Sequence, residues 1–195
     1  WTAQGCYTDT STSRTLAATS DVNETSMTVE SCLAFCASGG FNLAGVEYGS
    51  QCYCDYALQA SGTFSSAENC DIPCSGNTTE VCGGADFIDV YWNGAPLPIV
   101  PQTVGSWAYK GCFSDSVSSR VLPHQVTIPT GVSVESCTSA CNASDYGVAG
   151  LEFGLECWCS SSLPTSSLLS DDACRTACAA NTTEFCGGSS KLTVY

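Results

Sequence analysis

Two short stretches of the sequence gather polar groups around an aromatic side chain. In a β-strand, alternate side chains share a face, so a strand through the first stretch places Glu47, Gln51, Tyr53 and Asp55 on one side. A sugar presents an apolar C–H face that packs on an aromatic ring, while neighbouring polar groups bind its hydroxyls. The pattern therefore predicts a carbohydrate-binding surface centred on Tyr53.

The second stretch repeats this arrangement with Glu152, Glu156 and Trp158, and has Ser160 in the place of the last carboxylate. Both stretches have an alternative interpretation, in which a neighbouring loop covers Tyr53 and Trp158 and the two rings serve only the fold. Both interpretations stand at this stage, because residue types alone do not choose between them.

The same carboxylates can be compared with those of glycosidases, which usually work in pairs across a cleft. Glu47 with Asp55, or Glu152 with Glu156, would have to form such a pair. Each stretch belongs to a unit too small to enclose a sugar chain, and the second lacks a counterpart of Asp55. A serine or cysteine nucleophile would need a base, but His124 is the only histidine. We therefore predict that the protein is not an enzyme and needs no cofactor.

The other aromatic residues near these stretches are expected to be structural. Strand alternation places Tyr48 on the inner face with the cysteines, and Phe153 takes the same position in the second stretch, so both are predicted in the core. Gly49 could introduce a bulge that reverses part of this register. Tyr56 has no aromatic counterpart and would distinguish the first site if it were exposed. Core or end-packing positions are also expected for Tyr7, Phe113, Trp1, Trp92 and Trp107.

The two stretches recur because the chain consists of two tandem repeats of one unit. Eight cysteines in each half follow nearly identical intervals, which is the signature of an internal repeat. Asp9 with Arg14, and Asp115 with Arg120, flank equivalent turns and are predicted to form ion pairs. The cysteines, all predicted to form disulfides, are Cys6, Cys32, Cys36, Cys52, Cys54, Cys70, Cys74, Cys82, Cys112, Cys137, Cys141, Cys157, Cys159, Cys174, Cys178 and Cys186.

The repeat divides the chain into a first unit at 1–92 and a second unit at 107–195. The residues between them, 93–106, are rich in proline and are predicted to form an extended, semi-rigid spacer. Apolar side chains such as Leu97 and Ile99 could instead dock between the units and fix their angle. Units of about 90 residues have marginal cores, so covalent support from disulfides is expected.

One helix and one strand in each unit are predicted to be joined by two disulfides. The helix begins after Thr28 as its N-cap and ends at the glycines that follow. Its Cys32 and Cys36 are separated by a rise of about 6.0 Å, and Cys52 and Cys54 of the strand by about 6.6 Å. These lengths match, so side-by-side bridges are predicted, although the partner of each cysteine depends on the direction of the strand. The second unit repeats the scheme with Ser133, Cys137, Cys141, Cys157 and Cys159.

The composition indicates the cellular compartment of the protein and the classes of partner that it can bind. Sixteen cysteines in 195 residues persist as disulfides only in an oxidising compartment, which predicts a secreted, extracellular or cell-surface protein. The net charge of −14 argues against nucleic acid and anionic membranes, and no apolar run is long enough to span a bilayer. With only 12% charged residues, the surface suits a neutral polymer. The chain begins at Trp1 and is interpreted as already processed, and a monomer is expected.

Metal binding is not expected, because paired Cys-x-x-Cys sets are absent, His124 is alone, and no clustered Asp-x-Asp loop is present for calcium. Four acceptor sequences for N-glycosylation support passage through a secretory pathway. Two of these asparagines have an alternative role in the turn before a cysteine. The four acceptors are Asn23, Asn77, Asn142 and Asn181, and the turn role concerns Asn77 and Asn181.

The order of motifs resembles the WSC domain. Gly-Cys-Tyr-Thr-Asp at 5–9 and Cys-Gly-Gly at 82–84 recur at 111–115 and 186–188, with the Cys-x-x-x-Cys helix and the Cys-aromatic-Cys strand between them. The resemblance covers both units and implies an α+β fold like that of PAN/apple modules, with one helix on a short antiparallel sheet and four disulfides in each domain. It also implies a lectin-like protein that binds fungal cell-wall polysaccharide, chiefly β-1,3-glucan.

The resemblance allows two further settings, since members of the family occur as ectodomains of cell-wall stress sensors and as appendages of secreted enzymes that target glucan or xylan. The sequence departs from the common pattern of the family in two places. Asp55 and Ser160 follow the Cys-x-Cys stretches where many members have glycine, and Ala180 takes the place of Gly76 in the second unit. These departures leave open whether both units bind the same sugar.

Overall fold

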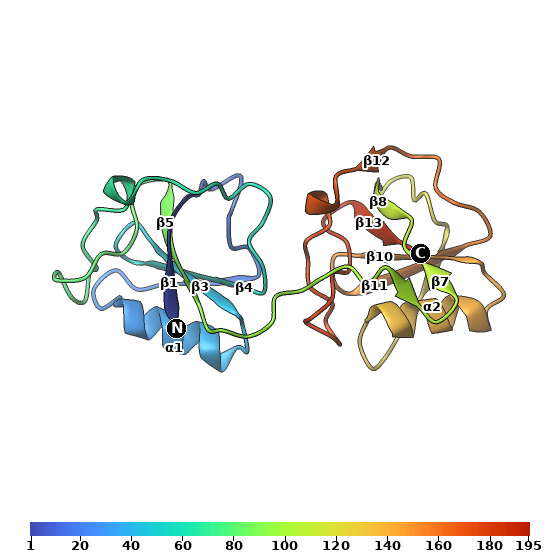
Figure 1. The fold of residues 1–195 in the computed structure, drawn as a ribbon, viewed down its shortest axis with the longest axis horizontal. Coiled ribbons are helices and arrows are strands. Elements are labelled where there is room, and N and C mark those ends of the chain that lie inside the picture. Colours follow the sequence, from blue (N-terminus) through green and yellow to red (C-terminus); the bar gives the residue numbers. More distant parts are fainter. The chain divides into compact units, whose positions relative to one another are not determined.

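The computed structural model describes all residues, 1–195, and contains two compact units, Trp1–Leu97 and Pro98–Tyr195 (Figure 1). Each unit is one helix packed on an antiparallel sheet, and each holds four disulfides. The predicted α+β class, with two small disulfide-rich domains, is therefore confirmed. No helix of either unit has the length and apolar character that crossing a membrane requires.

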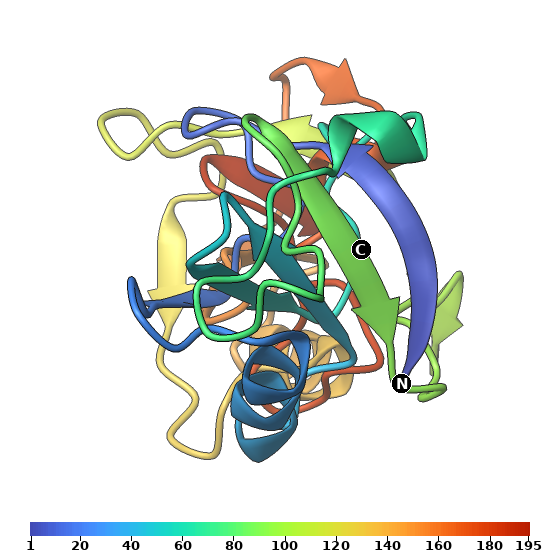
Figure 2. The same ribbon diagram turned by 90° about the vertical axis from the view of Figure 1, so that its left-hand side faces the viewer.

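A five-stranded sheet forms the first unit. Its elements are β1 (Thr2–Thr8), β2 (Thr19–Val22), α1 (Val29–Ser38), β3 (Leu43–Glu47), β4 (Gln51–Asp55), a short 3-10 helix η1 (Ala67–Asn69) and β5 (Phe87–Trp92). The strand order is β1-β5-β3-β4-β2. The first and last strands of the unit, β1 and β5, therefore lie side by side, as Figure 2 shows. The Cys-x-Cys strand β4 lies between β3 and β2.

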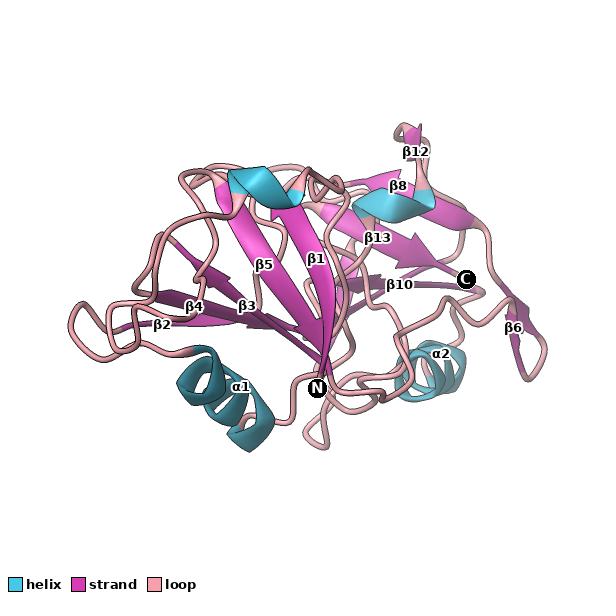
Figure 3. Ribbon diagram, turned by 60° about the vertical axis from the view of Figure 1, so that its left-hand side comes forward, coloured by secondary structure: helices cyan, strands magenta, loops and turns pink.

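The second unit repeats this sheet and adds a short hairpin before it. Its elements are β6 (Thr103–Val104), β7 (Trp107–Ala108), β8 (Gly111–Ser114), β9 (His124–Val126), α2 (Val134–Ala143), β10 (Val148–Glu152), β11 (Glu156–Ser160), β12 (Leu168–Leu169), a 3-10 helix η2 (Asp171–Ala173) and β13 (Lys191–Val194). The strand order is β12-β8-β13-β10-β11-β9, and β6 pairs with β7. Figure 3 shows each helix along one face of its own sheet.

Both helices begin at the predicted N-caps. The Thr28 hydroxyl accepts a hydrogen bond of 3.1 Å from the Ser31 backbone N–H, and the Ser133 hydroxyl accepts one of the same length from Ser136. These bonds satisfy N–H groups that the first helical turn leaves without a partner. α1 ends at Ser38, directly before the predicted glycines.

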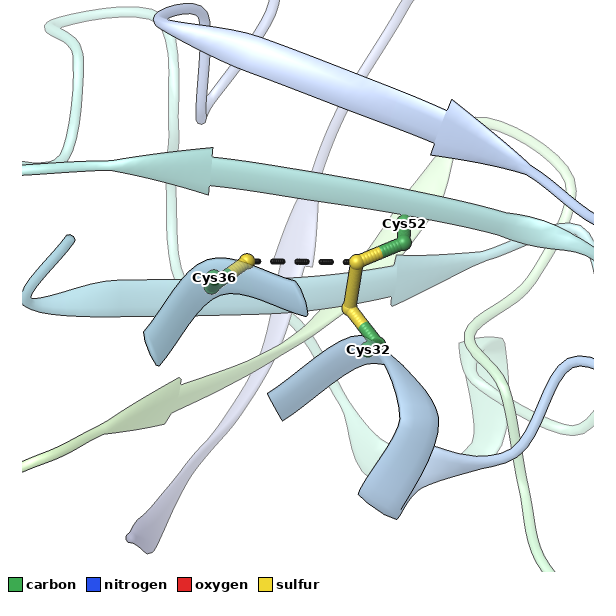
Figure 4. Close-up of side chains that lie close together, drawn as sticks. All are labelled: Cys32, Cys36 and Cys52. Carbon is green, nitrogen blue, oxygen red and sulfur yellow. Dashed lines mark hydrogen bonds between the residues drawn. A yellow bond between two sulfur atoms is a disulfide. The ribbon is translucent and has the colours of Figure 1, made fainter. Parts of the chain in front are cut away.

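The predicted bridges between helix and strand are present in both units. Cys32 pairs with Cys52 and Cys36 with Cys54, which shows that the helix and the strand run in the same direction. The second unit pairs Cys137 with Cys157 and Cys141 with Cys159. Figure 4 shows the first bridge, with the Cys36 Sγ lying 3.9 Å from the Cys52 Sγ. The sulfurs of Cys32, Cys36 and Cys52 lie close enough together to hold a metal ion. They are bonded in disulfides, however, so they offer no thiolate ligand.

The remaining cysteines close two further loops in each unit. The long loops are closed by Cys6–Cys70 and Cys112–Cys174, and the short ones by Cys74–Cys82 and Cys178–Cys186. The long bridges join the first strand of the sheet, β1 or β8, to the end of the 3-10 helix. All sixteen cysteines are therefore paired, as predicted.

The central strand β3 of the first unit's sheet is buried on both faces. On the helix side, Ala44 and Val46 pack with the disulfides. On the opposite side, Leu16 from the loop between β1 and β2 packs against Leu43 and Ile88. In the second unit Leu122, which follows Arg120 as Leu16 follows Arg14, packs in the same way with Leu192, Val194 and Trp158. These loops therefore cover much of the face on which the sugar-binding surface was predicted.

The proline-rich residues make contacts with the unit that each of them adjoins. Pro96 accepts a hydrogen bond of 2.8 Å from the Asn42 side chain of the first unit. The Ile99 backbone N–H donates to the Thr183 carbonyl, and the Ile99 carbonyl accepts from the Phe185 N–H, both at 3.0 Å. The Tyr195 hydroxyl donates to Pro101 at 2.8 Å. Much of this segment is therefore held by hydrogen bonds to its backbone groups.

Candidate functional site

The turn between β3 and β4 exposes an aromatic ring. Tyr48 has a φ of 51° and Phe153, in the equivalent turn of the second unit, has a φ of 52°. Their exposed fractions are 59% and 55%, so the prediction that they lie in the core is wrong. The strand ends one residue earlier, and a left-handed residue breaks the alternation on which the prediction depended. A left-handed conformation is uncommon for aromatic residues and is concentrated at functional positions.

Behind this turn, one arginine in each unit binds two buried carboxylates. Arg14 Nη1 contacts Asp9 and lies 2.5 Å from Glu47 Oε2. Asp9 and Glu47 are 1% and 4% exposed, so the two carboxylates are largely removed from water. The predicted ion pair of Asp9 with Arg14 is confirmed. Glu47, expected on an open surface, belongs to this buried network instead.

The second unit repeats the network and extends it. Arg120 Nη1 lies 2.6 Å from Asp115 and contacts Glu152, while its Nη2 lies 3.3 Å from Glu156 Oε2. Asp115 and Glu152 are buried, whereas the Glu156 side chain is 33% exposed. Arg120 therefore meets three carboxylates, where its counterpart in the first unit meets two.

The guanidinium groups also cover the rings that were predicted to stack on sugar. The Arg14 Cζ lies 4.4 Å from the centre of the Tyr53 ring, and the Arg120 Cζ lies 4.3 Å from the centre of Trp158. These are cation–π contacts, in which the arginine occupies the ring face. Trp158 is only 8% exposed. A sugar in this region would therefore meet the arginine and the ring edges first.

The polar neighbours of each ring lie where the alternation predicted. The Tyr53 hydroxyl donates to Gln51 Oε1 at 2.9 Å, and the Trp158 Nε1–H donates to Glu156 Oε2 at the same distance. Both acceptors are partly exposed at the start of their strands. The structure thus brings Gln51 beside Tyr53, and Glu156 beside Trp158.

Asp55 has a structural role rather than a place on the surface. It is 3% exposed, and its carboxylate accepts hydrogen bonds from the backbone N–H groups of Ala17 and Tyr56 at 2.8 and 2.7 Å and from the Gln59 side chain at 2.9 Å. The equivalent Ser160 is also buried and accepts from the Ser162 N–H at 3.2 Å. These residues hold the loop that follows the strand.

Two concave surfaces meet at Arg14. One has a volume of about 360 Å³ and the other about 510 Å³. We call the smaller one, which contains the exposed Tyr48, the Arg14 surface. It is lined by Ser11, Arg14, Glu47, Tyr48, Gln51, Ala85 and Asp86, and the second by Arg14, Leu16, Ala17, Ala18, Thr19, Ser20 and Tyr53.

Sequence reasoning did not assign Arg14 and Tyr48 to this surface. Arg14 was predicted only as the partner of Asp9, although its recurrence as Arg120 was a usable signal. Tyr48 was misplaced because its left-handed backbone is a property of the folded turn. The recurrence of aromatic-Gly before both Cys-x-Cys strands was the signal that could have identified it.

The other aromatic residues take mixed positions. Tyr56 is partly buried against Phe41, with ring centres 4.8 Å apart. Tyr7 and Phe113 are partly buried beside the core clusters, as expected. Trp92 and Trp107 are also partly buried beside core clusters, whereas Trp1 is 40% exposed and does not pack as predicted.

Asn77 belongs to a turn that caps a helix. Its side chain donates to Glu80, and its Oδ1 accepts from the Thr79 hydroxyl at 2.7 Å. Glu80 in turn accepts the Val29 N–H at the start of α1 at 3.0 Å. The second unit repeats this contact, with Glu184 accepting the Val134 N–H at 3.2 Å, and Asn181 accepting from Thr183. The predicted turn role of Asn77 and Asn181 is therefore present in the structure.

Burial changes the charge state of the glutamates in the arginine networks. Desolvation, together with the nearby Asp9 carboxylate, raises the pKa of Glu47 to about 7, against the opposite effect of Arg14. Desolvation and a hydrogen bond with Asp115 raise the pKa of Glu152 to about 7. Burial alone would raise the pKa of Asp115, but hydrogen bonds from Arg120 and the backbone lower it overall. In the second unit, Asp115 therefore holds the charge and Glu152 takes up the proton.

We expect the free energy of unfolding to fall as the pH rises from about 4.5 to about 7. Each glutamate has a pKa of 4.5 when unfolded and about 7 when folded, so the folded state binds more protons in this window. The resulting stabilisation is complete below pH 4.5 and is lost as the pH passes 7. Denaturant unfolding across this range, with disulfides intact, measures it.

The variant Glu47→Gln with Glu152→Gln should flatten this pH dependence, leaving the contribution of Glu184, whose pKa burial also raises to about 7. A wild-type protein that gained stability between pH 5 and pH 7 would contradict the expectation.

Comparison with known families finds the WSC domain twice, at residues 3–84 and 109–188. Two WSC domain-containing proteins of Arthroderma benhamiae are 35% and 34% identical over the whole chain, which spans about a quarter of their length, 26% and 24%. A protein of Chaetomium globosum is 34% identical, and the chain covers 91% of it. Part of the chain, 46%, is 32% identical to 10% of the Xylosyltransferase oxt of Drosophila melanogaster. The chain therefore belongs to the WSC domain family, which is associated with carbohydrate binding.

Proposed function

We propose that the protein is a secreted, non-catalytic lectin that binds neutral cell-wall polysaccharide, with β-1,3-glucan as the favoured ligand. The observation that carries this proposal is the exposed Tyr48, held in a left-handed turn at the rim of the concave Arg14 surface. An aromatic ring beside hydrogen-bonding groups is the arrangement that packs on a sugar face and binds its hydroxyls.

The groups around Tyr48 suit hydroxyls. The Arg14 side chain is 25% exposed and offers N–H donors, while Gln51 offers an amide and Ser11 a hydroxyl. Asp86, which also lines the surface, adds an acceptor. A neutral ligand is favoured because the guanidinium is already neutralised by two carboxylates, so little net positive charge remains for an acidic sugar.

The repeat supports a polymeric ligand. Two weak sites on one chain raise the overall avidity for a repetitive polymer, provided that both can engage it at once. The eight disulfides support secretion, because they form and persist in oxidising compartments.

The positions of the carboxylates favour binding over hydrolysis. Glu47 is tied to Arg14, and Asp55 is enclosed by its own hydrogen bonds. Neither carboxylate is placed to act on a sugar across a cleft, as a glycosidase pair would be. Since the chain spans only about a quarter of the Arthroderma proteins, a role as a glucan- or xylan-targeting part of a longer enzyme, or of a wall sensor, is the alternative setting for the same binding activity.

Retention on insoluble β-1,3-glucan tests this proposal. We expect Tyr48→Ala to weaken binding about threefold to tenfold, because an aromatic contact contributes about 0.5–1.5 kcal/mol. Phe64→Ala is the matched control, since Phe64 is 72% exposed but lies outside the Arg14 surface. Equal retention of wild type and Tyr48→Ala would contradict the role of the surface. Retention on cellulose or chitin as strong as on the glucan would contradict the favoured ligand.

A further inference from the structure

The second unit has a concave surface that shares no residue with its arginine network. It has a volume of about 320 Å³ and is formed by the last turn of α2, the residues that follow this helix, strand β7 and the end of the chain. Figure 3 shows the hairpin of β6 and β7 beside α2. We call this concavity the Asn142 surface, and its lining includes Trp107, Lys110, Asn142, Tyr146 and Tyr195.

The aromatic rings of the Asn142 surface are fixed by contacts within the chain. The Tyr146 ring stacks on His124, with ring centres 4.6 Å apart. Tyr195 is 2% exposed, and its hydroxyl donates to the Pro101 carbonyl at 2.8 Å. Trp107 packs, partly buried, against the core cluster of the second unit. Rings that are already fixed lose little conformational entropy when a ligand packs on them.

Asn142 is an accessible acceptor for N-glycosylation. It is exposed in the last turn of α2, and Ala143 and Ser144 complete the acceptor sequence. Its side chain makes no hydrogen bond within the chain. The asparagines of the other three acceptor sequences are half-buried, and the side-chain oxygen of each accepts a hydrogen bond from its own turn; these are Asn23, Asn77 and Asn181. Of the four asparagines, Asn142 is the one that is exposed.

We propose that Asn142 carries an N-linked glycan whose first sugar, N-acetylglucosamine, packs on the aromatic rings of the Asn142 surface. The donor is an oligosaccharyl diphosphate lipid of the secretory pathway. The Asn142 Nδ2 forms a bond to the anomeric carbon of the donor and loses one proton. The bond from that carbon to the diphosphate oxygen breaks, and the diphosphate departs with its electron pair. This inference is independent of the glucan-binding proposal, which concerns the Arg14 surface.

A weak contact is sufficient because the sugar is tethered. The first sugar is joined directly to the Asn142 amide, so its contact with rings of the same surface is intramolecular and has a high effective concentration. Trp107 and Tyr146 can pack on the C–H face of the sugar. The Trp107 indole N–H and the exposed Lys110 ammonium have no hydrogen-bond or ion-pair partner within the chain, so they are donors for the hydroxyl and acetamido oxygens.

The first unit lacks this acceptor and therefore provides a matched control. By the repeat, Ala37 takes the place of Asn142, and Trp1 takes the place of Trp107. Trp1 is 40% exposed. A glycan on Asn142 is therefore expected to change the environment of Trp107 and to leave that of Trp1 unchanged.

Mass spectrometry of glycopeptides from the full chain, secreted by a eukaryotic host, tests whether Asn142 is modified. We expect a glycan at Asn142 in most molecules and none in Ser144→Ala. This variant removes the acceptor sequence but leaves the lining of the Asn142 surface unchanged. Wild-type protein without a glycan at Asn142 would overturn the proposal.

Trimming the glycan to its first N-acetylglucosamine then tests whether this sugar packs on the surface. We expect hydrogen exchange of the Trp107 indole N–H, followed by NMR, to be about threefold to tenfold slower than in Ser144→Ala, the change that one aromatic contact produces. The Trp1 indole N–H should exchange at the same rate in both proteins. Equal exchange at Trp107 would show that the sugar does not pack there, and the proposal would be wrong.

Enzymatic release of the untrimmed glycan from the native protein gives a second measurement. An amidase that cleaves the bond between Asn142 and the sugar should act about threefold to tenfold faster on Trp107→Leu than on wild type, because leucine keeps apolar packing but has no ring for the sugar. Trp1→Leu is the matched control and should leave the rate unchanged. An unchanged rate in Trp107→Leu, or the same acceleration in Trp1→Leu, would contradict packing on the Asn142 surface.

Discussion

Replacing Arg14 with methionine is expected to lower the free energy of unfolding of the first unit by about 3–5 kcal/mol. The substitution leaves two buried carboxylates, Asp9 and Glu47, without the cation that offsets their mutual repulsion and their loss of hydration. It also removes the cation–π contact with Tyr53. The methionine keeps much of the apolar packing, so the loss is electrostatic in origin.

Hydrogen exchange of the β3 and β4 amides during denaturant titration measures this effect, because it separates the first unit from the second. Arg175→Met is the control in the second unit, where the β10 and β11 amides report the effect: its ion pair with Asp172 is exposed, and a change below about 1 kcal/mol is expected. Adding Asp9→Asn and Glu47→Gln to the Arg14 variant should recover part of the stability. A loss no larger than that of the Arg175 variant would contradict the buried network as a stabilising element.

Removing the Cys6–Cys70 disulfide by a double substitution with alanine is expected to cost about 4 kcal/mol in the chain-entropy model. The bridge spans 64 residues, and both of its cysteines are buried. Without it the unfolded chain gains freedom over most of the unit, and β1 loses its covalent link to the end of η1. Calorimetric or denaturant unfolding of the double variant measures the loss.

The Cys74–Cys82 bridge provides the comparison within the same unit. It spans only 8 residues, so the same model predicts a cost of about 2–3 kcal/mol for its removal. The difference between the two double variants is the informative quantity, because each loses two sulfur atoms from the core. Equal losses would show that packing around the sulfurs, rather than loop entropy, determines the effect.

Much of the fold follows from local patterns. The repeat, the capped helix and the matching rises of Cys-x-x-x-Cys and Cys-x-Cys predicted two units, each with two bridges between helix and strand, and these are present. These features depend on spacings within short segments, which the sequence displays directly. The ion pairs of Arg14 with Asp9 and of Arg120 with Asp115 were also predicted, because in each pair the two residues are five positions apart. The α+β fold was implied by the resemblance to the WSC domain.

The site was only partly predictable. Strand alternation correctly placed Gln51 beside Tyr53 and Glu156 beside Trp158, but it put Tyr48 and Phe153 in the core and left Glu47 and Asp55 open. Which helix cysteine pairs with which strand cysteine could be decided only from the folded chain. The same holds for the partners of Cys6 and Cys74.

The sequence by itself determined the repeat, the helix and the linkage of the helix cysteines to the strand cysteines, because these depend on residue types and short spacings. Only the tertiary structure decided which face is open. The loop that carries Arg14 and Leu16 folds over the sheet, buries the carboxylates and covers the Tyr53 ring. A left-handed turn then moves Tyr48 to the surface. Loop packing and a backbone conformation of positive φ have no periodicity in the sequence, so no strand pattern could predict them.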